Sequence, residues 1–277
     1  MDVVALDFET FTRPDFSLRD MTSTQYVLSP EFEVIIMGIK VNSTSPGWVS
    51  GRGQQIQKQL DGVDWDNSIL LAHNAKFDAS ILSWHYGKQA KFTICTEALS
   101  RVVNPRERKH NLADVVKRHS LGIKGTAVQD FKGMRLDDFT SAELQVYGEY
   151  CVNDVELTYR LFEKLSSKVS PEELHLISLT QEMFINPTIK LDKQLLGRYI
   201  EQLKEERQET ITASGLDLKT LRSRPKFKAY LESNDIPIPM KISPRTNEPT
   251  PAFAKKDRAF LKLRKHPVVG RAVEAKI

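Results

Sequence analysis

Cysteine is scarce in this sequence, which has only Cys95 and Cys151 in its 277 residues. Neither has a second cysteine or a histidine at metal-ligand spacing, so no disulfide framework and no zinc site is indicated. We expect both thiols to be buried. The sequence also lacks any apolar run near the roughly 20 residues of a membrane-spanning helix, and its N-terminus lacks the basic region and cleavage site of a leader. These absences favour a cytoplasmic protein without a membrane role.

A large excess of one charge is also absent, since the formal net charge is +4. The distribution is uneven: residues 1–169 carry −2, residues 170–277 carry +6, and residues 219–277 alone carry +10. A basic region of this kind suits a polyanion such as nucleic acid. An ordinary solvated basic surface explains the charge equally well, so charge alone leaves both interpretations open.

The first 169 residues predict an α/β fold. Short apolar, β-branched runs indicate buried strands, and apolar residues at three- and four-residue spacing indicate helices. The predicted strands cover 3–8, 33–41, 47–50 and 68–73, and the predicted helices cover 54–60, 77–86, 112–119 and 141–165. Thr140 with Glu143 suits a capping box at the start of the last helix. Strands followed by alternation with helices argue for a mixed sheet flanked by helices.

The pattern changes near Ser170-Pro171, where we place a domain boundary. Pro171 suits the first turn of a helix. A long charged helix is predicted over 194–212, an extended connector over 236–251 because of its five prolines, and a basic helical stretch from Asp257 onward. We therefore expect an α/β domain over 1–169 and a smaller, mostly helical, basic region without evident strands over 170–277.

Three short motifs carry the candidate chemistry. Asp7 and Glu9 are two residues apart at the end of a predicted strand, so their side chains share one face. Asp78 lies on the first turn of a predicted helix that directly follows the predicted strand 68–73. In open sheets, ligands bind at the carboxyl ends of strands. Tyr150 and Asp154 are four residues apart and share one helix face.

Each motif alone has an ordinary interpretation as a solvated strand end, a helix first turn or a packing tyrosine. Their order and positions together predict one pocket with four carboxylates, which cannot all stay ionised unless cations neutralise them. Two Mg²⁺ or Mn²⁺ ions fit such a pocket, and the predicted chemistry is metal-assisted phosphodiester hydrolysis. Tyr150 would orient the attacking water.

At these residues the sequence resembles the DEDD superfamily of 3′-to-5′ exonucleases, which have an RNase H-like fold. The three motifs Asp7-x-Glu9, Asn74-x-x-x-Asp78 and Tyr150-x-x-x-Asp154 look like its exonuclease motifs, with Tyr150 in place of the histidine of another subclass. Further segments resemble the N-terminal half of phage-type family A (DNA polymerase I-like) polymerases: 7–10, 33–39, 96–99, 110–114 and 182–192. The similarity thereby covers most of the chain.

The resemblance implies that Asp7, Glu9, Asp78 and Asp154 hold two divalent ions and that Tyr150 places the water. It implies release of nucleoside 5′-monophosphates from a single-stranded 3′ end of DNA, as in proofreading. Candidate contacts to the terminal nucleotide come from a separate group of side chains: His73, Asn74, Lys76 and an apolar residue such as Phe8 or Leu6.

One departure from the polymerase family limits the expected activity. No His-Asp-Glu triplet and no lysine-rich helix ending in Tyr-Gly is present, so we expect no DNA synthesis by this chain alone. The part from Pro171 onward resembles the start of a thumb, whose basic residues would follow a primer-template. Two interpretations stay open: the chain is a truncated part of a polymerase, or it is one half of a polymerase encoded in two pieces, with a separately encoded polymerase partner. An RNase D-like exonuclease acting on RNA and a noncatalytic nucleic-acid-binding subunit of a polymerase assembly remain as alternatives.

Overall fold

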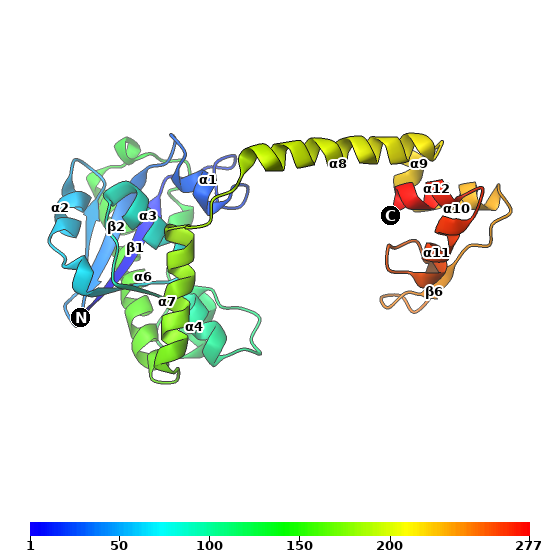
Figure 1. Cartoon of the computed structure of the whole chain (residues 1–277). Helices are drawn as coiled ribbons and strands as arrows, with labels where there is room; N and C mark the ends of the chain where they lie inside the picture. The colour runs from blue at the N-terminus through cyan, green and yellow to red at the C-terminus, as the bar shows by residue number, and fades with distance from the viewer. The chain divides into compact units, whose positions relative to one another are not determined.

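A five-stranded mixed sheet organises the first part of the protein, in the order β3-β2-β1-β4-β5. The computed structural model describes residues 1–277 (Figure 1). Strand β1 pairs antiparallel with β2 and parallel with β4; β2–β3 is antiparallel and β4–β5 parallel. The strands are β1 (Asp2–Thr10), β2 (Val34–Val41), β3 (Gly47–Ser50), β4 (Ser68–Ala72) and β5 (Phe92–Cys95).

Seven helices accompany this sheet: α1 (Ser23–Val27), α2 (Gln55–Asp61), α3 (Lys76–Tyr86), α4 (Thr96–Val103), α5 (Leu112–Arg118), α6 (Ser141–Ser166) and α7 (Pro171–Ile185). The 26-residue helix α6 packs along strands β1 to β4 (Figure 1). It begins at Thr140, whose side chain accepts a hydrogen bond from the Glu143 amide in the predicted capping box. Because α6 crosses several strands, its side chains can contact residues of more than one strand.

Alternation along β1 separates apolar from acidic side chains. Leu6 and Phe8 are buried on one face, where the Phe8 ring stacks on Tyr86 of α3. Ala5 lies on the opposite face and packs in a small core with Val155 of α6. Since side chains two residues apart share a face, Asp7 and Glu9 are directed toward α6.

A glycine allows α6 to lie close to the sheet. Gly148 on α6 faces the indole ring of Trp48 on β3, and a Cβ atom at position 148 would lie 2.2 Å from that ring. Real Cβ atoms do not approach so closely, so a larger residue would push the helix away. The close contact fixes α6 two residues before Tyr150 and six residues before Asp154, the residues of its acidic motif.

The structure confirms the predicted α/β fold with a mixed sheet and helices. The four predicted strands are present, and the predicted helices agree with α2, α3, α5 and α6 to within one or two residues at each end. Strand β5 was not predicted, because Phe92–Cys95 is only four residues long and its parallel partner β4 lies some 20 residues earlier. No helix combines the length and the apolar character needed to cross a bilayer.

Residues 189–277 form the second compact unit. Its helices are α8 (Lys193–Ala213), α9 (Leu218–Arg222), α10 (Arg224–Glu232), α11 (Arg258–Lys262) and α12 (Gly270–Lys276). Phe227, Phe253 and Phe260 form an aromatic core with edge-on and tilted rings. The unit also contains the antiparallel strands β6 (Met240–Ile242) and β7 (Pro249–Pro251).

This hairpin corrects the expectation that the second part has no strands and that 236–251 is an extended connector. Pro249 and Pro251 lack an amide hydrogen, yet each strand has only one neighbour, so their missing donors can face away from the ladder. The first compact unit is Met1–Thr188, so α7 packs with the sheet, notably on β5. The structural division thus lies one helix after the expected boundary between residues 169 and 170. The expected boundary remains a proposal about where the exonuclease module ends.

Candidate active site

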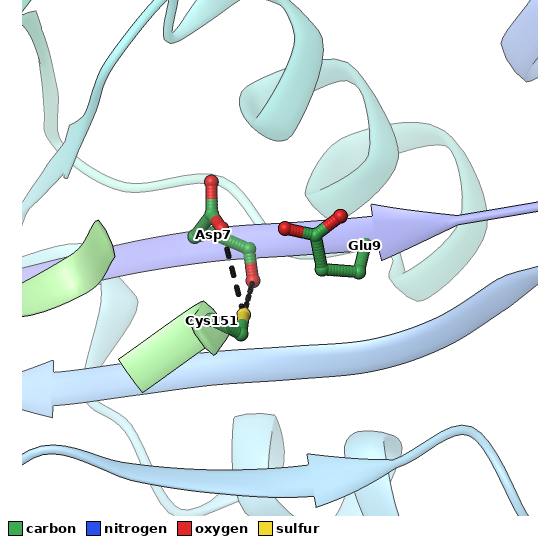
Figure 2. A group of neighbouring side chains, drawn as sticks. All are labelled: Asp7, Glu9 and Cys151. Atoms are coloured by element: carbon green, nitrogen blue, oxygen red, sulfur yellow. Dashed lines mark hydrogen bonds between the residues drawn. The ribbon is translucent and has the colours of Figure 1, made fainter. Parts of the chain in front are cut away.

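Two acids and a thiol meet where β1 faces α6 (Figure 2). A carboxylate oxygen of Asp7, one of Glu9 and the Cys151 sulfur lie within 4.8 Å of one another. The Cys151 thiol donates to the Asp7 carbonyl oxygen at 3.3 Å and contacts its carboxylate at 3.5 Å. Burial raises the pKa of Asp7, although the nearby Lys124 charge and the thiol contact oppose this effect. Ionisation of both Asp7 and Glu9 in this poorly solvated place is therefore costly unless a cation neutralises them.

Asp78 joins these acids from the first turn of α3. Its side chain is only 3% exposed and accepts a hydrogen bond of 3.0 Å from the backbone amide of Phe8, the residue between Asp7 and Glu9. Burial and the charges of Asp7 and Glu9 raise the pKa of Asp78 well above its ordinary value. The third carboxylate thus lies against the same segment of β1.

The acidic motif of α6 supplies Tyr150 and Asp154, both of which are buried. Lys124, from the loop after α5, forms an ion pair with Asp154 and donates to the Tyr150 hydroxyl at 2.6 Å. The charge of Lys124 also lowers the pKa values of Asp7 and Glu9. This one ammonium group therefore connects the α6 motif with the acids of β1.

A second tyrosine of α6 holds Glu9. The Tyr147 hydroxyl donates to the Glu9 carboxylate at 2.7 Å, and Tyr147 itself is 3% exposed. Burial and the Asp7 charge raise the pKa of Glu9 to about 8, while the hydrogen bond from Tyr147 lowers it. The phenol thus favours the ionised form that a cation would bind.

The predicted substrate contacts have separate positions. His73 forms a 2.9 Å hydrogen bond with Thr96, and the Lys76 ammonium lies 5.0 Å from the centroid of the Phe184 ring. Asn74 is exposed in a left-handed turn conformation with φ 61°. A role of His73, Asn74 or Lys76 in substrate binding stays a prediction. Phe8 is 4% exposed and lies in the core, and its contact with a nucleotide likewise stays a prediction.

Leu6, the other apolar candidate, is 1% exposed and lies in the core like Phe8. Lys124, Tyr147 and Cys151, by contrast, were not predicted as site residues. Tyr147 and Cys151 carry a helical signal, because Tyr147 lies three residues before Tyr150 and Cys151 three residues before Asp154. Lys124 lies in a loop, and no local pattern indicates its contacts.

The donor set suits a hard divalent cation. All four acidic side chains offer oxygen, the ligand atom that Mg²⁺ prefers and that Mn²⁺ also accepts. The Oδ1 atom of Asp154 is buried and has no hydrogen-bond partner. A buried carboxylate oxygen without a partner is costly, and coordination would satisfy it. The oxygen donors are compatible with the metal-binding role predicted for Asp7, Glu9, Asp78 and Asp154, which stays a prediction; of these acids, only Asp7 and Glu9 belong to the group of side chains within 4.8 Å of one another.

Comparison with known families agrees with this geometry. The family model described as 3′-5′ exonuclease, of the DNA polymerase A type, matches residues 1–170. The chain belongs to this family. The chain is 31% identical over 125 residues to DNA polymerase I of Synechocystis, a match that covers 43% of this chain and 12% of that protein. The chain thus corresponds to a small part of that relative.

Two solved structures resemble the chain in fold. The POL domain of Pol1 from M. smegmatis, in complex with a DNA primer-template and dNTP, has a TM-score of 0.54 at 15% identity, over 100% of this chain and 44% of that one. Trypanosoma brucei RNase D with RNA U12 has a TM-score of 0.50 at 15% identity, over 68% of this chain and 66% of that one. At such low identity these similarities support the fold of the exonuclease domain and nothing further.

Proposed function

We propose that this chain is a metal-dependent 3′-5′ exodeoxyribonuclease that releases nucleoside 5′-monophosphates from the 3′ end of DNA. The observation that carries the proposal is the approach of Asp7, Glu9 and Asp78 on one segment of β1, next to the Lys124 ammonium that also pairs with Asp154. Three buried acids at one segment of β1, with Asp154 reached through Lys124, favour cation binding.

In this proposal Asp7, Glu9, Asp78 and Asp154 hold two Mg²⁺ or Mn²⁺ ions. Such ions lower the pKa of a bound water and neutralise charge on the leaving oxygen of a phosphodiester. The protein contributes the positions of the ligands. Tyr147 keeps Glu9 oriented through its 2.7 Å hydrogen bond, and the Phe8 amide does the same for Asp78 at 3.0 Å.

Tyr150 is suited to orient the attacking water. Its oxygen accepts a hydrogen bond from Lys124, so its own O–H group remains available as a donor. Burial and the charges of Glu9 and Asp7 raise the pKa of Tyr150, which keeps the phenol protonated at neutral pH. A protonated phenol can hold a water by hydrogen bonding but cannot act as its base.

DNA is proposed as the substrate because the relative above 30% identity is a DNA polymerase. Proofreading follows from the same relative: a mismatched 3′ end melts more readily and reaches a single-strand site more often. The proposal includes a polymerase partner, either on the same longer polypeptide or separately encoded. It also includes a cytoplasmic location. The basic residues 219–277, with a net charge of +10, would act as a thumb-like region that follows the primer-template.

The test is the release of label from 3′-labelled single-stranded DNA and from an RNA of matched sequence, with Mg²⁺, with Mn²⁺ and with EDTA. We expect mononucleotide release from DNA in the metal-containing samples only. Asp7→Ala should reduce the rate at least about 1,000-fold, since loss of a metal ligand costs several kcal/mol of barrier. Asp20→Ala removes an exposed aspartate outside the site and should leave the rate unchanged.

Three results would contradict the proposal. Equal rates for wild type and Asp7→Ala would exclude the carboxylate site, and absence of nucleotide release with either ion would exclude the enzyme class. Preferential degradation of RNA would replace the DNA assignment with an RNase D-like one.

A further inference from the structure

Lys124 is the basic residue that pairs with Asp154 and whose charge acts on Asp7 and Glu9. Its ammonium forms the ion pair with Asp154, donates to the Tyr150 hydroxyl at 2.6 Å and lies 4.6 Å from the centroid of the Tyr150 ring. The Lys124 side chain is 26% exposed and that of Asp154 is 4% exposed. No other lysine or arginine forms an ion pair with the four acids. A largely buried charge with three such contacts is strongly held.

The loop that carries Lys124 is shaped to approach Tyr150. Gly125 follows the lysine directly, and a Cβ atom there would lie 3.0 Å from the Tyr150 ring. Asn153 of α6 also donates to the carbonyl oxygen of Ile123 at 3.1 Å, which ties the loop to the same helix. Contacts on both sides of Lys124 thus direct its side chain toward the α6 motif.

We propose that Lys124 is a positioning residue that competes with the divalent ion for Asp154. This inference rests on the metal site of the proposed function. The ammonium neutralises Asp154 and fixes Tyr150 in the absence of an ion. An ion bound by Asp154 would be repelled by an ammonium at the same carboxylate, because two cations that share one anion oppose each other in a poorly solvated site.

The competition has two opposite consequences. Lys124 stabilises the ion-free fold, since Asp154 would otherwise be a buried charge without a partner. It also weakens ion binding, since the ammonium must leave Asp154 and keep only its bond to Tyr150. A lysine with a purely structural role would not improve ion binding when removed.

The experiment measures Mn²⁺ binding by calorimetry and thermal unfolding with and without Mn²⁺, on full-length protein. Lys124→Met should bind Mn²⁺ about tenfold more tightly or better, a change of about 1.4 kcal/mol. Its melting temperature should be lower than that of wild type without the ion, and Mn²⁺ should raise it by a larger increment. Lys124→Gln can still donate to Tyr150 but lacks the charge, so the same gain in affinity would assign the effect to charge.

Lys88→Met is the matched control, because Lys88 forms a 2.7 Å ion pair with Asp61 and contacts none of the site residues. It should leave the affinity for Mn²⁺ unchanged. Absence of Mn²⁺ binding by wild type would overturn the proposed function itself. Binding by wild type that Asp154→Ala abolishes, with unchanged or weaker affinity in both Lys124 variants, would overturn this inference alone. If Lys124→Met does not fold without the ion, Lys124→Gln and the samples with Mn²⁺ still decide the question.

Discussion

Replacement of Tyr147 by phenylalanine tests how the fold controls Glu9, a proposed metal ligand. The change removes one hydroxyl group, which donates to Glu9 at 2.7 Å, and keeps the ring that packs against Phe139 and Phe131. A hydrogen bond to a charged group contributes about 1.5–3 kcal/mol. If this contribution supports the productive position of Glu9, Tyr147→Phe should lower kcat/KM about 10- to 150-fold.

The loss of kcat/KM in Tyr147→Phe should depend on pH, and the contacts of Glu9 determine in which direction. The Tyr147 hydrogen bond lowers the pKa of Glu9, which burial and Asp7 raise to about 8. Without the hydroxyl the pKa rises further, so a larger fraction of Glu9 is protonated near neutral pH and fewer molecules can bind the ion. The deficit should therefore be greatest at low pH and shrink as pH increases, because the ionised carboxylate is the ligand.

The assay is nucleotide release from 3′-labelled DNA at saturating Mg²⁺, measured from pH 6.5 to 9. Tyr159→Phe serves as the control, because Tyr159 lies on the same helix but contacts Lys40 instead of the acids. Equal losses in the two variants would attribute the effect to helix packing. A deficit in Tyr147→Phe that does not change with pH would refute the electrostatic part of the reasoning.

Three further predictions concern stability and reactivity. Gly148→Ala should destabilise the protein by about 1–3 kcal/mol in urea unfolding because its Cβ would meet Trp48, whereas Gly197→Ala on α8 has open space and should be neutral or stabilising; equal effects would contradict the packing argument. Burial lowers the pKa of His73 to about 4, so the free energy of unfolding should fall by up to about 3 kcal/mol as pH decreases from about 6.5 to 4. In His73→Asn, melting temperatures should depend less on pH over this range. Burial raises the pKa of Cys151, so its thiol should not react with a disulfide reagent until denaturant is added; rapid reaction in the native protein would refute its burial.

The sheet and the site share one structural cause. Strand β1 lies in the middle of the sheet, so its carboxyl end reaches both α3, which follows the parallel neighbour β4, and α6, which crosses the sheet. Acids on β1, α3 and α6 therefore meet although they are far apart in the sequence. This is the usual position of sites in open α/β sheets.

Local patterns predicted the elements that depend on neighbouring residues. The apolar runs of β1 and β2 identify buried strands, and Thr140 with Glu143 marks the start of α6 because both groups of the capping box lie within one turn. Elements that depend on distant partners were missed or misjudged. Strand β5 exists because β4 offers its edge, and the β6–β7 hairpin tolerates Pro249 and Pro251 because each strand has a single neighbour.

The sequence by itself determined the candidate site residues: spacing of two on a strand aligns Asp7 with Glu9, and spacing of four on a helix aligns Tyr150 with Asp154. Only the tertiary structure decided their surroundings. Lys124 reaches Asp154 across 30 residues, and Tyr147 reaches Glu9 across 138 residues. Such contacts arise when packing closes long loops, and no short-range pattern encodes them. The charge balance and the pKa values of the acids are therefore properties of the fold.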